Sequence, residues 1–365
     1  MPSYTGRVGI VQRVLPRYRA PFFDLLASQC ERGLSVFAGA ARPSESIPIA
    51  EKLAIAKWTQ AGNIHLFGGP FYLCWQRGLI QWLAEWDPDV LIVEANPRYV
   101  STPAALAWMK KRSRPVIGWG LGSPIPRGPV ARLRIQARKR FVRQFDALIA
   151  YSRRGAEEYA TLGFPAGRVF VAPNAVSPRP LGKPPEQPPA FAGQATVLYV
   201  GRLQSRKRLQ NLIRAFVGLP EQPRLVIVGD GPQRQELEAL ARQLHPGTEF
   251  RGALFGDELE IAFKEADLFV LPGTGGLAVQ QAMAHGLPVI AAEGDGSQED
   301  MVTSANGWLL PPRDDVALGA ALTEALSNPA RLRKMGSESF RLVQEKFNLE
   351  AMAGAFVEAI HEVAR

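Results

Sequence analysis

The sequence predicts an α/β protein built from two Rossmann-like, doubly wound domains, and three observations support this fold class. The chain has 365 residues, enough for two domains of ordinary size. Short apolar runs alternate with longer segments of helical period, as expected for parallel sheets flanked by helices. A proline-rich segment at 177–195 then divides this alternation into two similar halves.

The apolar runs of the first half, residues 1–176, are rich in Val and Ile and bounded by turn residues, which is typical of buried parallel strands. We expect strands at 7–12, 34–40, 89–95, 115–120, 146–152 and 168–173. Apolar residues of helical period lie between these runs. We expect helices at 20–31, 71–86, 101–112 and 129–145.

The segment 177–195 contains six prolines and is expected to be an interdomain linker, because proline neither continues a helix nor joins a central strand. The alternation restarts in the second domain, 196–345. Strands are expected there at 196–203, 224–231, 248–254, 266–273, 287–294 and 306–312. A last helix, 346–365, is expected to pack back on the N-terminal domain. Two such domains facing one another would hold a ligand in the central cleft, at the carboxyl ends of their strands.

Composition indicates a soluble, cytoplasmic protein. Hydrophobic residues make up 46% of the chain and charged residues 21%, as in globular proteins with large cores. The two cysteines, Cys30 and Cys74, show no metal-binding spacing and fit a reducing compartment. The N-terminus lacks the layout of a signal peptide, and no uncharged apolar run approaches the roughly 20 residues that span a bilayer. We expect at most a peripheral contact with the inner face of the plasma membrane.

The net charge of +9 is unevenly placed, since residues 1–180 carry 25 Lys and Arg against 11 Asp and Glu. A basic half fits an anionic membrane, an acidic substrate, nucleic acid or simply a solvated surface. Nucleic acid is disfavoured because no aromatic stacking platform accompanies the charge. The segment 129–145 interleaves basic and apolar residues, which indicates an amphipathic surface for anionic lipid. Its basic residues are Arg132, Arg134, Arg138, Lys139, Arg140 and Arg143.

Two loops of the second half are suited to binding phosphate. In "YVGRLQSRK", Gly201 ends a strand, and Arg202 and Lys207 lie five residues apart across a turn into a helix. Such a pair fits a diphosphate, because Arg chelates it in a bidentate manner and Lys supplies a compact charge. The alternative is a pair of exposed charges near a helix start. A tight turn, "GDGP", follows the next strand and is by itself a weak signal.

The second such loop, "PGTGGLAVQQAMAHG", combines Thr274 with three glycines, Gly273, Gly275 and Gly276. A loop almost free of side chains lets backbone N–H groups at the next helix approach an anion. Gln281 is expected to face the same space, and Gln280 either that space or the core. A further loop follows the strand at 287–294 and leads to Glu299 near the start of another helix.

Taken in order, "GRLxxxK", "LVIVGDGP", "FRGAL", the Gly-rich loop with "AMAHGLPVIA", and "GSQE" closely resemble the family 4, or group 1, glycosyltransferases of the GT-B fold. The resemblance covers most of 196–315 and extends backwards through 146–178. It implies a nucleotide-sugar donor, UDP- or GDP-linked, on the C-terminal domain and an acceptor on the N-terminal domain. No resident cofactor is implied, and no pair of acidic metal ligands stands beside the donor site.

The resemblance also assigns residues. Arg202 and Lys207 match the pair that holds the donor diphosphate. Gly252, Ala253 and Leu254 fall where the backbone meets the base, and Glu299 falls near the diphosphate and donor sugar. The sequence departs from the family where two glutamates usually stand eight positions apart, because Gly273 and Gln281 occupy these positions. A glutamine carbonyl still accepts a hydrogen bond from a ribose hydroxyl.

The first half departs further from the family. Its first loop carries Arg13, Arg17 and Arg19, which fit either an acceptor phosphate, such as that of a lipid diphosphate, or a solvated turn. Glu94, at a strand end, is the candidate general base for an acceptor hydroxyl.

Taken together, the sequence predicts a retaining, metal-independent hexosyltransferase acting on a membrane-associated glycan or glycolipid. Two alternatives keep the fold. The altered Gly273 and Gln281 positions fit a nucleotide-sugar-binding protein without transferase activity, and Glu94 with Glu299 would serve a nucleotide-sugar epimerase.

Overall fold

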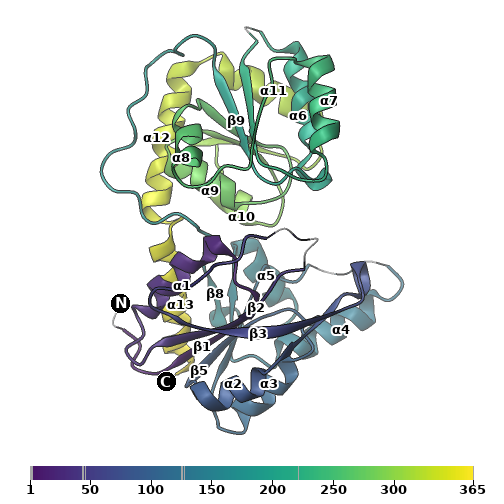
Figure 1. Ribbon diagram of the computed structural model, residues 1–365, viewed down its shortest axis with the longest axis vertical. Coiled ribbons are helices and arrows are strands. Elements are labelled where there is room, and N and C mark those ends of the chain that lie inside the picture. The colour runs from purple at the N-terminus through teal and green to yellow at the C-terminus, as the bar shows by residue number, and fades with distance from the viewer. Residues whose placement is uncertain are drawn as a thin grey trace. The chain divides into compact units, whose positions relative to one another are not determined.

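Parallel strands with helices on both faces make up each of two units of the chain (Figure 1). The computed structural model describes residues 3–42, 45, 47–124, 126, 128–220 and 222–364. The N-terminal unit comprises Met1–Val176 together with Leu349–Arg365, and the C-terminal unit comprises Ser177–Asn348. The chain therefore leaves the first unit once and returns to it for its last helix. Arg365, the end of the predicted last helix, lies outside the described residues.

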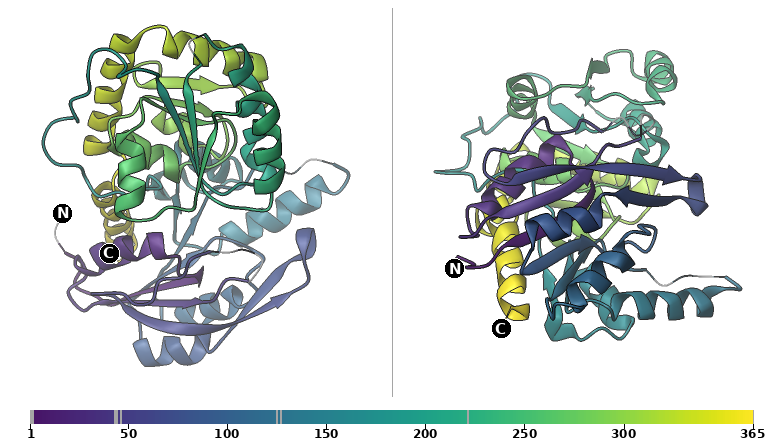
Figure 2. Two further views of the ribbon diagram at one scale, coloured as in Figure 1. Left: turned by 45° about the horizontal axis from the view of Figure 1, so that its top comes forward. Right: turned by 60° about the horizontal axis from the view of Figure 1, so that its bottom comes forward.

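The sheet of the N-terminal unit has the order β4-β3-β2-β1-β5-β6-β7-β8, parallel except for β4. Its strands are β1 (Val8–Val14), β2 (Leu34–Gly39), β3 (Lys57–Leu66), β4 (Leu73–Arg77), β5 (Val90–Glu94), β6 (Val116–Gly120), β7 (Ala147–Ala150) and β8 (Val169–Val171). The order reverses between β1 and β5, as in doubly wound folds. β3 and β4 form a long hairpin that extends beyond the rest of the sheet (Figure 2).

Helices cover both faces of this sheet, and alternate residues of each strand feed a separate core. The helices are α1 (Ala20–Ala27), α2 (Leu79–Trp86), α3 (Thr102–Lys110), α4 (Ala131–Val142), α5 (Arg153–Thr161) and α13 (Leu349–Val363). In β5, Val90 and Ile92 pack with α1 and α13, whereas Leu91 and Val93 pack with α2 and α3. Continuous apolar strands are required for this two-sided burial.

The hairpin corrects one sequence prediction. Residues 71–86 were expected to form a single helix, but β4 occupies Leu73–Arg77 and α2 begins at Leu79. Gly78, with φ +85°, separates the two elements in a left-handed conformation that glycine adopts readily. The partner strand β3 was not predicted, because its sequence "KWTQAGNIHL" mixes polar and apolar residues.

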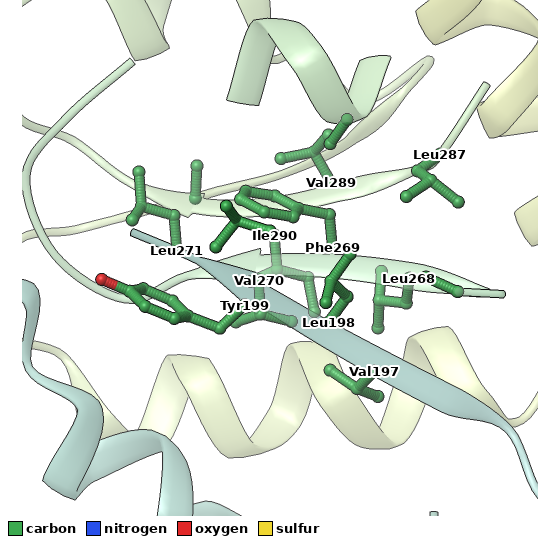
Figure 3. Close-up of a cluster of buried hydrophobic side chains, with 14 of the residues drawn as sticks. Val197, Leu198, Tyr199, Leu268, Phe269, Val270, Leu271, Leu287, Val289 and Ile290 are labelled. Atoms are coloured by element: carbon green, nitrogen blue, oxygen red, sulfur yellow. The ribbon is translucent and has the colours of Figure 1, made fainter. Parts of the chain in front are cut away.

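The C-terminal unit is a six-stranded parallel sheet of order β11-β10-β9-β12-β13-β14. Its strands are β9 (Thr196–Val200), β10 (Arg224–Val228), β11 (Glu249–Gly252), β12 (Leu268–Leu271), β13 (Val289–Ala292) and β14 (Gly307–Leu310). Figure 3 shows how side chains of β9, β12 and β13 gather in one buried cluster. Burial of these central strands fixes the positions at which their carboxyl-end loops emerge.

Helices again cover both faces of the sheet, with α6, α7 and α11 on one face and α8, α9 and α12 on the other (Figure 1). The helices of this unit are α6 (Leu209–Ala215), α7 (Arg234–Leu244), α8 (Asp257–Lys264), α9 (Leu277–Ala284), α10 (Ser297–Met301), α11 (Asp315–Leu326) and α12 (Pro329–Glu345). The proline-rich segment 177–195 belongs to this unit. Arg333 of α12 holds it through the side chain of Gln187 and, at 2.8 Å, the carbonyl of Pro188.

Candidate functional site

The sheet of the C-terminal unit reverses its order at β9, which lies between β10 and β12. Loops after the two strands flanking such a reversal diverge, and ligands of doubly wound proteins bind in the crevice they leave. The two loops are 201–208, which follows β9, and 272–276, which follows β12. Both were singled out in the sequence as phosphate-binding loops.

Lys207 is the central charged group of this crevice. It ends the 3-10 turn η5 (Ser205–Lys207), is only 8% exposed, and donates a hydrogen bond from Nζ to the carbonyl of Thr274. Burial and, to a smaller extent, the Arg206 charge lower the pKa of the ammonium group to about 8, although the Asp295 charge opposes the change. A poorly solvated cation beside a bare backbone loop is well suited to receive a phosphate group.

The Gly-rich loop packs directly on the loop that carries Lys207. The Thr274 N–H donates to the Arg206 carbonyl at 3.2 Å, and the Arg206 guanidinium donates to the Thr274 hydroxyl at 3.2 Å. A Cβ at Gly273 would lie 2.2 Å from the Arg206 carbonyl oxygen, so no side chain fits there without a backbone shift. A Cβ at Gly275 would lie 2.3 Å from Lys207 Nζ. The glycines therefore make room for the lysine.

This packing bears on the backbone donors expected for phosphate. The Thr274 N–H is engaged with Arg206, so the N–H groups of Gly275 and Gly276 are the remaining candidates from this loop. The same packing leaves no room for a side chain at position 273, because backbone atoms of Arg206 and Lys207 occupy the space that it would need.

Asp295 is a residue of this crevice that the sequence did not reveal. It follows β13, accepts hydrogen bonds from both the backbone N–H and the hydroxyl of Ser297, and acts electrostatically on Lys207. A Cβ at Gly276 would clash with the Ser297 hydroxyl, which brings this turn against the Gly-rich loop. The turn "EGDGS" contains Asp295, but the residue predicted from this loop was Glu299, which is half-buried in α10.

The two adjacent glutamines of α9 have different surroundings. Gln280 is fully buried: its Oε1 accepts from the Ser177 N–H at 3.1 Å, and its Nε2 donates to the Phe347 carbonyl at 2.8 Å. Gln280 thus faces the core, the second of the two positions expected for it. Gln281, the next residue of the helix, is half-buried.

The remaining predicted donor-site residues also lie at carboxyl ends of strands. Arg202 is half-buried directly after Gly201, whose φ of +152° is unfavourable for other residues, and its carbonyl accepts from the Tyr199 hydroxyl at 3.2 Å. Gly252 ends β11 with φ +72°, and its carbonyl accepts from the Gly229 N–H at 2.6 Å. Ala253, which follows it, is exposed, and Leu254 is half-buried.

In the N-terminal unit, Glu94 and Arg13 meet at the corresponding reversal between β1 and β5. The Glu94 Oε2 accepts from the Arg13 backbone N–H at 2.6 Å. Burial raises the pKa of Glu94 to about 7, although this hydrogen bond and the Arg13 charge oppose the shift. A carboxyl group with this pKa is suited to general base catalysis near neutral pH.

The structure does not bring the three arginines of the first loop together. Arg13 donates to Glu45 at 2.8 Å, and Arg17 forms an exposed ion pair with Glu51 at 3.3 Å. Burial alone would raise the pKa of Glu45, but hydrogen bonds from Arg13 and Arg42 hold it at about 2. Arg13 is therefore already neutralised in part.

Arg19 is a structural residue of the core. It is 5% exposed, donates to Asn174 Oδ1 at 2.7 Å, and contacts the sulfur of Met352 in α13. Its guanidinium also lies 5.6 Å from the Trp119 ring centroid. Since its donors are directed at these buried groups, we place Arg19 with the packing of α13 rather than with acceptor binding.

Glu94 lines a pocket of about 420 Å³ at the carboxyl ends of β5 and β6. Trp119, Tyr151 and Tyr159 form its aromatic walls, and Arg98 and Arg138 contribute cations. Aromatic walls with one carboxyl group and two guanidinium groups suit a ring that carries hydroxyl groups. This pocket is the candidate acceptor site of the N-terminal unit.

Within the described ranges, the structure contains no group of three or more His, Cys, Asp or Glu side chains arranged to hold a metal ion. Nor is any helix in that part of the chain long and apolar enough to cross a membrane.

Both halves of the chain match models of glycosyltransferase families. Residues 183–341 match the model of the family "Glycosyl transferases group 1", and residues 22–175 match the "Glycosyl transferase 4-like domain". Among curated proteins, the chain is 39% identical over 124 residues to the sulfoquinovosyl transferase SQD2 of Arabidopsis thaliana, an alignment covering 32% of this chain and 24% of that one. It is 28% identical over 276 residues to a D-inositol 3-phosphate glycosyltransferase of Xylanimonas cellulosilytica, covering 66% of this chain and 62% of the relative. The chain thus spans less than two thirds of the length of these relatives.

Solved structures share the fold over almost the whole chain. HepE of Anabaena, solved with UDP, superposes with a TM-score of 0.71 at 16% identity, covering 98% of this chain and 99% of that one. The sucrose-phosphate synthase of Thermosynechococcus elongatus gives a TM-score of 0.71 at 20% identity and 98% coverage of both chains. The predicted fold class, GT-B with two Rossmann-like domains, is confirmed.

Proposed function

Because these models match both of its halves, the chain belongs to the group 1, family 4-like glycosyltransferases, and we propose that it transfers a hexosyl group from a nucleotide-sugar to a membrane-associated glycan or glycolipid. The observation that carries the proposal is the buried Lys207 at the reversal of the C-terminal sheet, held against a loop of glycines. This arrangement supports a UDP- or GDP-linked donor with its diphosphate between the two loops.

In the proposed mechanism, the diphosphate replaces the Thr274 carbonyl as the partner of Lys207. Arg202 adds a second cation, and the N–H groups of Gly275 and Gly276 approach the phosphate oxygens without interference from side chains. The negative charge that develops on the leaving diphosphate is then stabilised by groups already in position, which is the largest contribution to many such reactions. We propose that no metal ion and no resident cofactor take part, and that the anomeric configuration is retained.

Gln281 is the proposed partner of the donor ribose and Glu299 that of the donor sugar, while Gly252, Ala253 and Leu254 are proposed to contact the base. On the acceptor side, Glu94 is the proposed base for the incoming hydroxyl, in the pocket walled by Trp119. Arg13 and Arg17 remain candidates for an acceptor phosphate. The basic residues of α4 are proposed to hold the protein at an anionic membrane surface.

Donor binding tests the central step. The purified protein is heated with UDP-, GDP-, ADP- and TDP-sugars in turn. A donor at about 100 times its Kd should stabilise the protein by about 2.7 kcal/mol. Replacing Arg202 by Ala or Lys207 by Met removes a charge-assisted contact and should weaken binding roughly 10- to 100-fold. Lys264→Ala, at an exposed position of the same unit, is the matched control.

Failure of every nucleotide-sugar to stabilise the protein, or equal binding by Lys207→Met, would contradict the proposed donor site. The competing function is nucleotide-sugar binding without transfer, which the absence of a carboxylate at Gly273 favours. Donor binding without product in the presence of lipid-linked acceptors would support that function. A change of sugar configuration without acceptor would indicate an epimerase.

A further inference from the structure

The β3–β4 hairpin of the N-terminal unit has an apolar outer face. Ile64 pairs with Trp75 and Leu66 with Leu73, so these four side chains share one face of the hairpin. Trp75 is 48% exposed and Leu66 39%. The connecting turn adds two further exposed aromatic side chains, Phe67 and Phe71.

Phe67 and Phe71 are 73% and 78% exposed, among the most exposed large apolar side chains of the described residues. Phe67 adopts φ +57°, a conformation that is rare for a bulky residue. A depression of about 620 Å³ lies at this turn and is lined by Phe67, Gly68, Phe71, Tyr72, Leu73 and Arg98. An apolar depression with a guanidinium at its rim matches a lipid with an anionic head group.

The inner face of the hairpin is polar, and its hydrogen bonds fix which way the apolar face points. Asn63 Nδ2 donates to the Arg13 carbonyl at 2.7 Å, and Gln76 Nε2 donates to the Gln12 carbonyl at 3.0 Å. His65 pairs with the Tyr72 hydroxyl at 2.9 Å. An edge hairpin ordinarily turns its apolar side inwards. A shift of one residue would bury the apolar face, but it would break every one of these contacts.

The outer edge of the hairpin is not open for pairing with a further strand. The backbone N–H of Cys74 donates to the Arg98 carbonyl at 2.9 Å, and the Val100 N–H donates to the Cys74 carbonyl at 2.9 Å. Segment 98–100 therefore covers the outer edge of β4. The side chains, not an open sheet edge, are available for contact, as on surfaces that bind membranes or proteins.

The charge around the hairpin favours a membrane over a second protein chain as the partner of this face. No Asp or Glu occurs in 52–84 or in 95–145, whereas both segments contain Lys and Arg. Helix α4, which exposes Arg132, Leu133 and Arg134, projects from the same side of the unit as the hairpin in Figures 1 and 2. A second copy of the chain would bring like charges together, while an anionic bilayer attracts them.

We propose that the outer face of the β3–β4 hairpin, with Phe67, Phe71 and Trp75 at its centre, inserts into the interface of an anionic membrane. Aromatic rings favour the head-group region of a bilayer, where their apolar bodies are buried. The proposal deepens the membrane-associated acceptor of the proposed function and rests on it for its biological purpose. It does not depend on donor chemistry, because lipid binding is measured without nucleotide-sugar.

The test is sedimentation of the full chain with vesicles of phosphatidylcholine alone or mixed with phosphatidylglycerol, at low and high salt. The wild-type protein should bind the mixed vesicles. Phe67→Ser with Phe71→Ser should lower the partition coefficient on the order of tenfold or more, since each ring loses apolar burial. Phe255→Ser, at a position 58% exposed in the C-terminal unit, is the matched control and should bind normally.

Trp75→Ser provides a second variant in case the double substitution fails to fold, and thermal unfolding checks both. Unchanged binding by the folded hairpin variants, or no binding by the wild-type protein, would overturn the proposal. Light scattering that shows a dimer dissolved by these substitutions, with vesicle binding intact, would overturn it in favour of a second copy. A donor-induced thermal shift that persists in the hairpin variants separates failure here from failure of the donor site.

Discussion

Burial of the charged Lys207 side chain at the candidate donor site lowers the stability of the folded protein. Burial lowers its pKa from 10.5 to about 8, so the unfolded chain binds more protons than the folded chain between these pH values. The free energy of unfolding should therefore rise with pH through this window. At pH 7, the free energy of unfolding of Lys207→Met should be about 1–3 kcal/mol higher than that of the wild-type protein. In the variant, this free energy should no longer rise with pH through the same window. Denaturant titrations at pH 7 and pH 10 measure both effects.

The stabilised variant should also bind donor roughly 10- to 100-fold more weakly, because the phosphate loses its main cation. A variant that is less stable than the wild-type protein at pH 7 would show that the hydrogen bond to Thr274 outweighs the burial of the charge. Lys264→Met, at an exposed position, controls for the substitution itself.

Glu94 and Lys207 together predict a pH profile for transfer. The proposed base, Glu94, can accept a proton only when ionised, so kcat/KM should rise through its pKa of about 7. The proposed contact of Lys207 with the donor phosphate requires a protonated ammonium group, so kcat/KM should fall above a pH of about 8. Initial rates at subsaturating donor give the resulting bell. Glu94→Gln should remove the acidic limb and lower the rate roughly 100-fold; a profile that keeps this limb would assign the base elsewhere.

Helix α9 carries two adjacent glutamines, one with a structural role and one with a proposed role in donor binding. Gln280 joins Ser177, at the start of the C-terminal unit, to Phe347, near its end. Gln280→Leu leaves the half-buried Ser177 N–H and the buried Phe347 carbonyl without this partner and should cost about 1–3 kcal/mol of stability. Gln281→Leu, at the adjacent half-buried position, should change stability little but weaken donor binding. Thermal unfolding with and without donor separates the two.

If both variants lost stability equally, the assignment of the neighbouring glutamines to core and pocket would be wrong. The sequence could not make that assignment, because the start of the helix sets which of two adjacent side chains points inwards, and a run of glycines hides that start. The Gly-rich loop itself was predictable, since three glycines after an apolar strand have few other uses.

At the level of elements, the parallel strands could be predicted because burial on both faces demands continuous apolar runs. The β3–β4 hairpin could not, because β3 mixes polar and apolar residues and the residues of β4 were assigned to the predicted helix 71–86. Two further residues depend on contacts that are distant in sequence. Asp295 was not predicted, and Arg19 was predicted to bind an acceptor phosphate but is buried in the core. Their surroundings come from segments distant in sequence, such as Lys207 for Asp295 and Asn174 for Arg19.

The whole molecule is two units whose boundaries do not follow the order of the chain. Helix α13 comes last in the sequence but packs on α1, β7 and β8 of the N-terminal unit. The ring of Phe356 lies 4.9 Å from those of Phe22 and Trp119, and Met352, Val357 and Ile360 are also fully buried. The N-terminal unit therefore depends on residues that follow the entire C-terminal unit.

This dependence predicts how the chain divides. Each large apolar side chain of α13 contributes about 1.5–3 kcal/mol on burial, so four of them approach the whole stability of a domain, about 5–15 kcal/mol. Fragment 1–176 alone should lack a cooperative thermal transition and bind a hydrophobic dye, whereas fragment 177–348 should unfold cooperatively. Adding a peptide of residues 349–365 to the first fragment should restore its transition. A peptide with Phe356→Ala should fail where one with the exposed Glu358→Ala succeeds; cooperative unfolding of 1–176 without any peptide would mean that α13 only covers a core that is already formed.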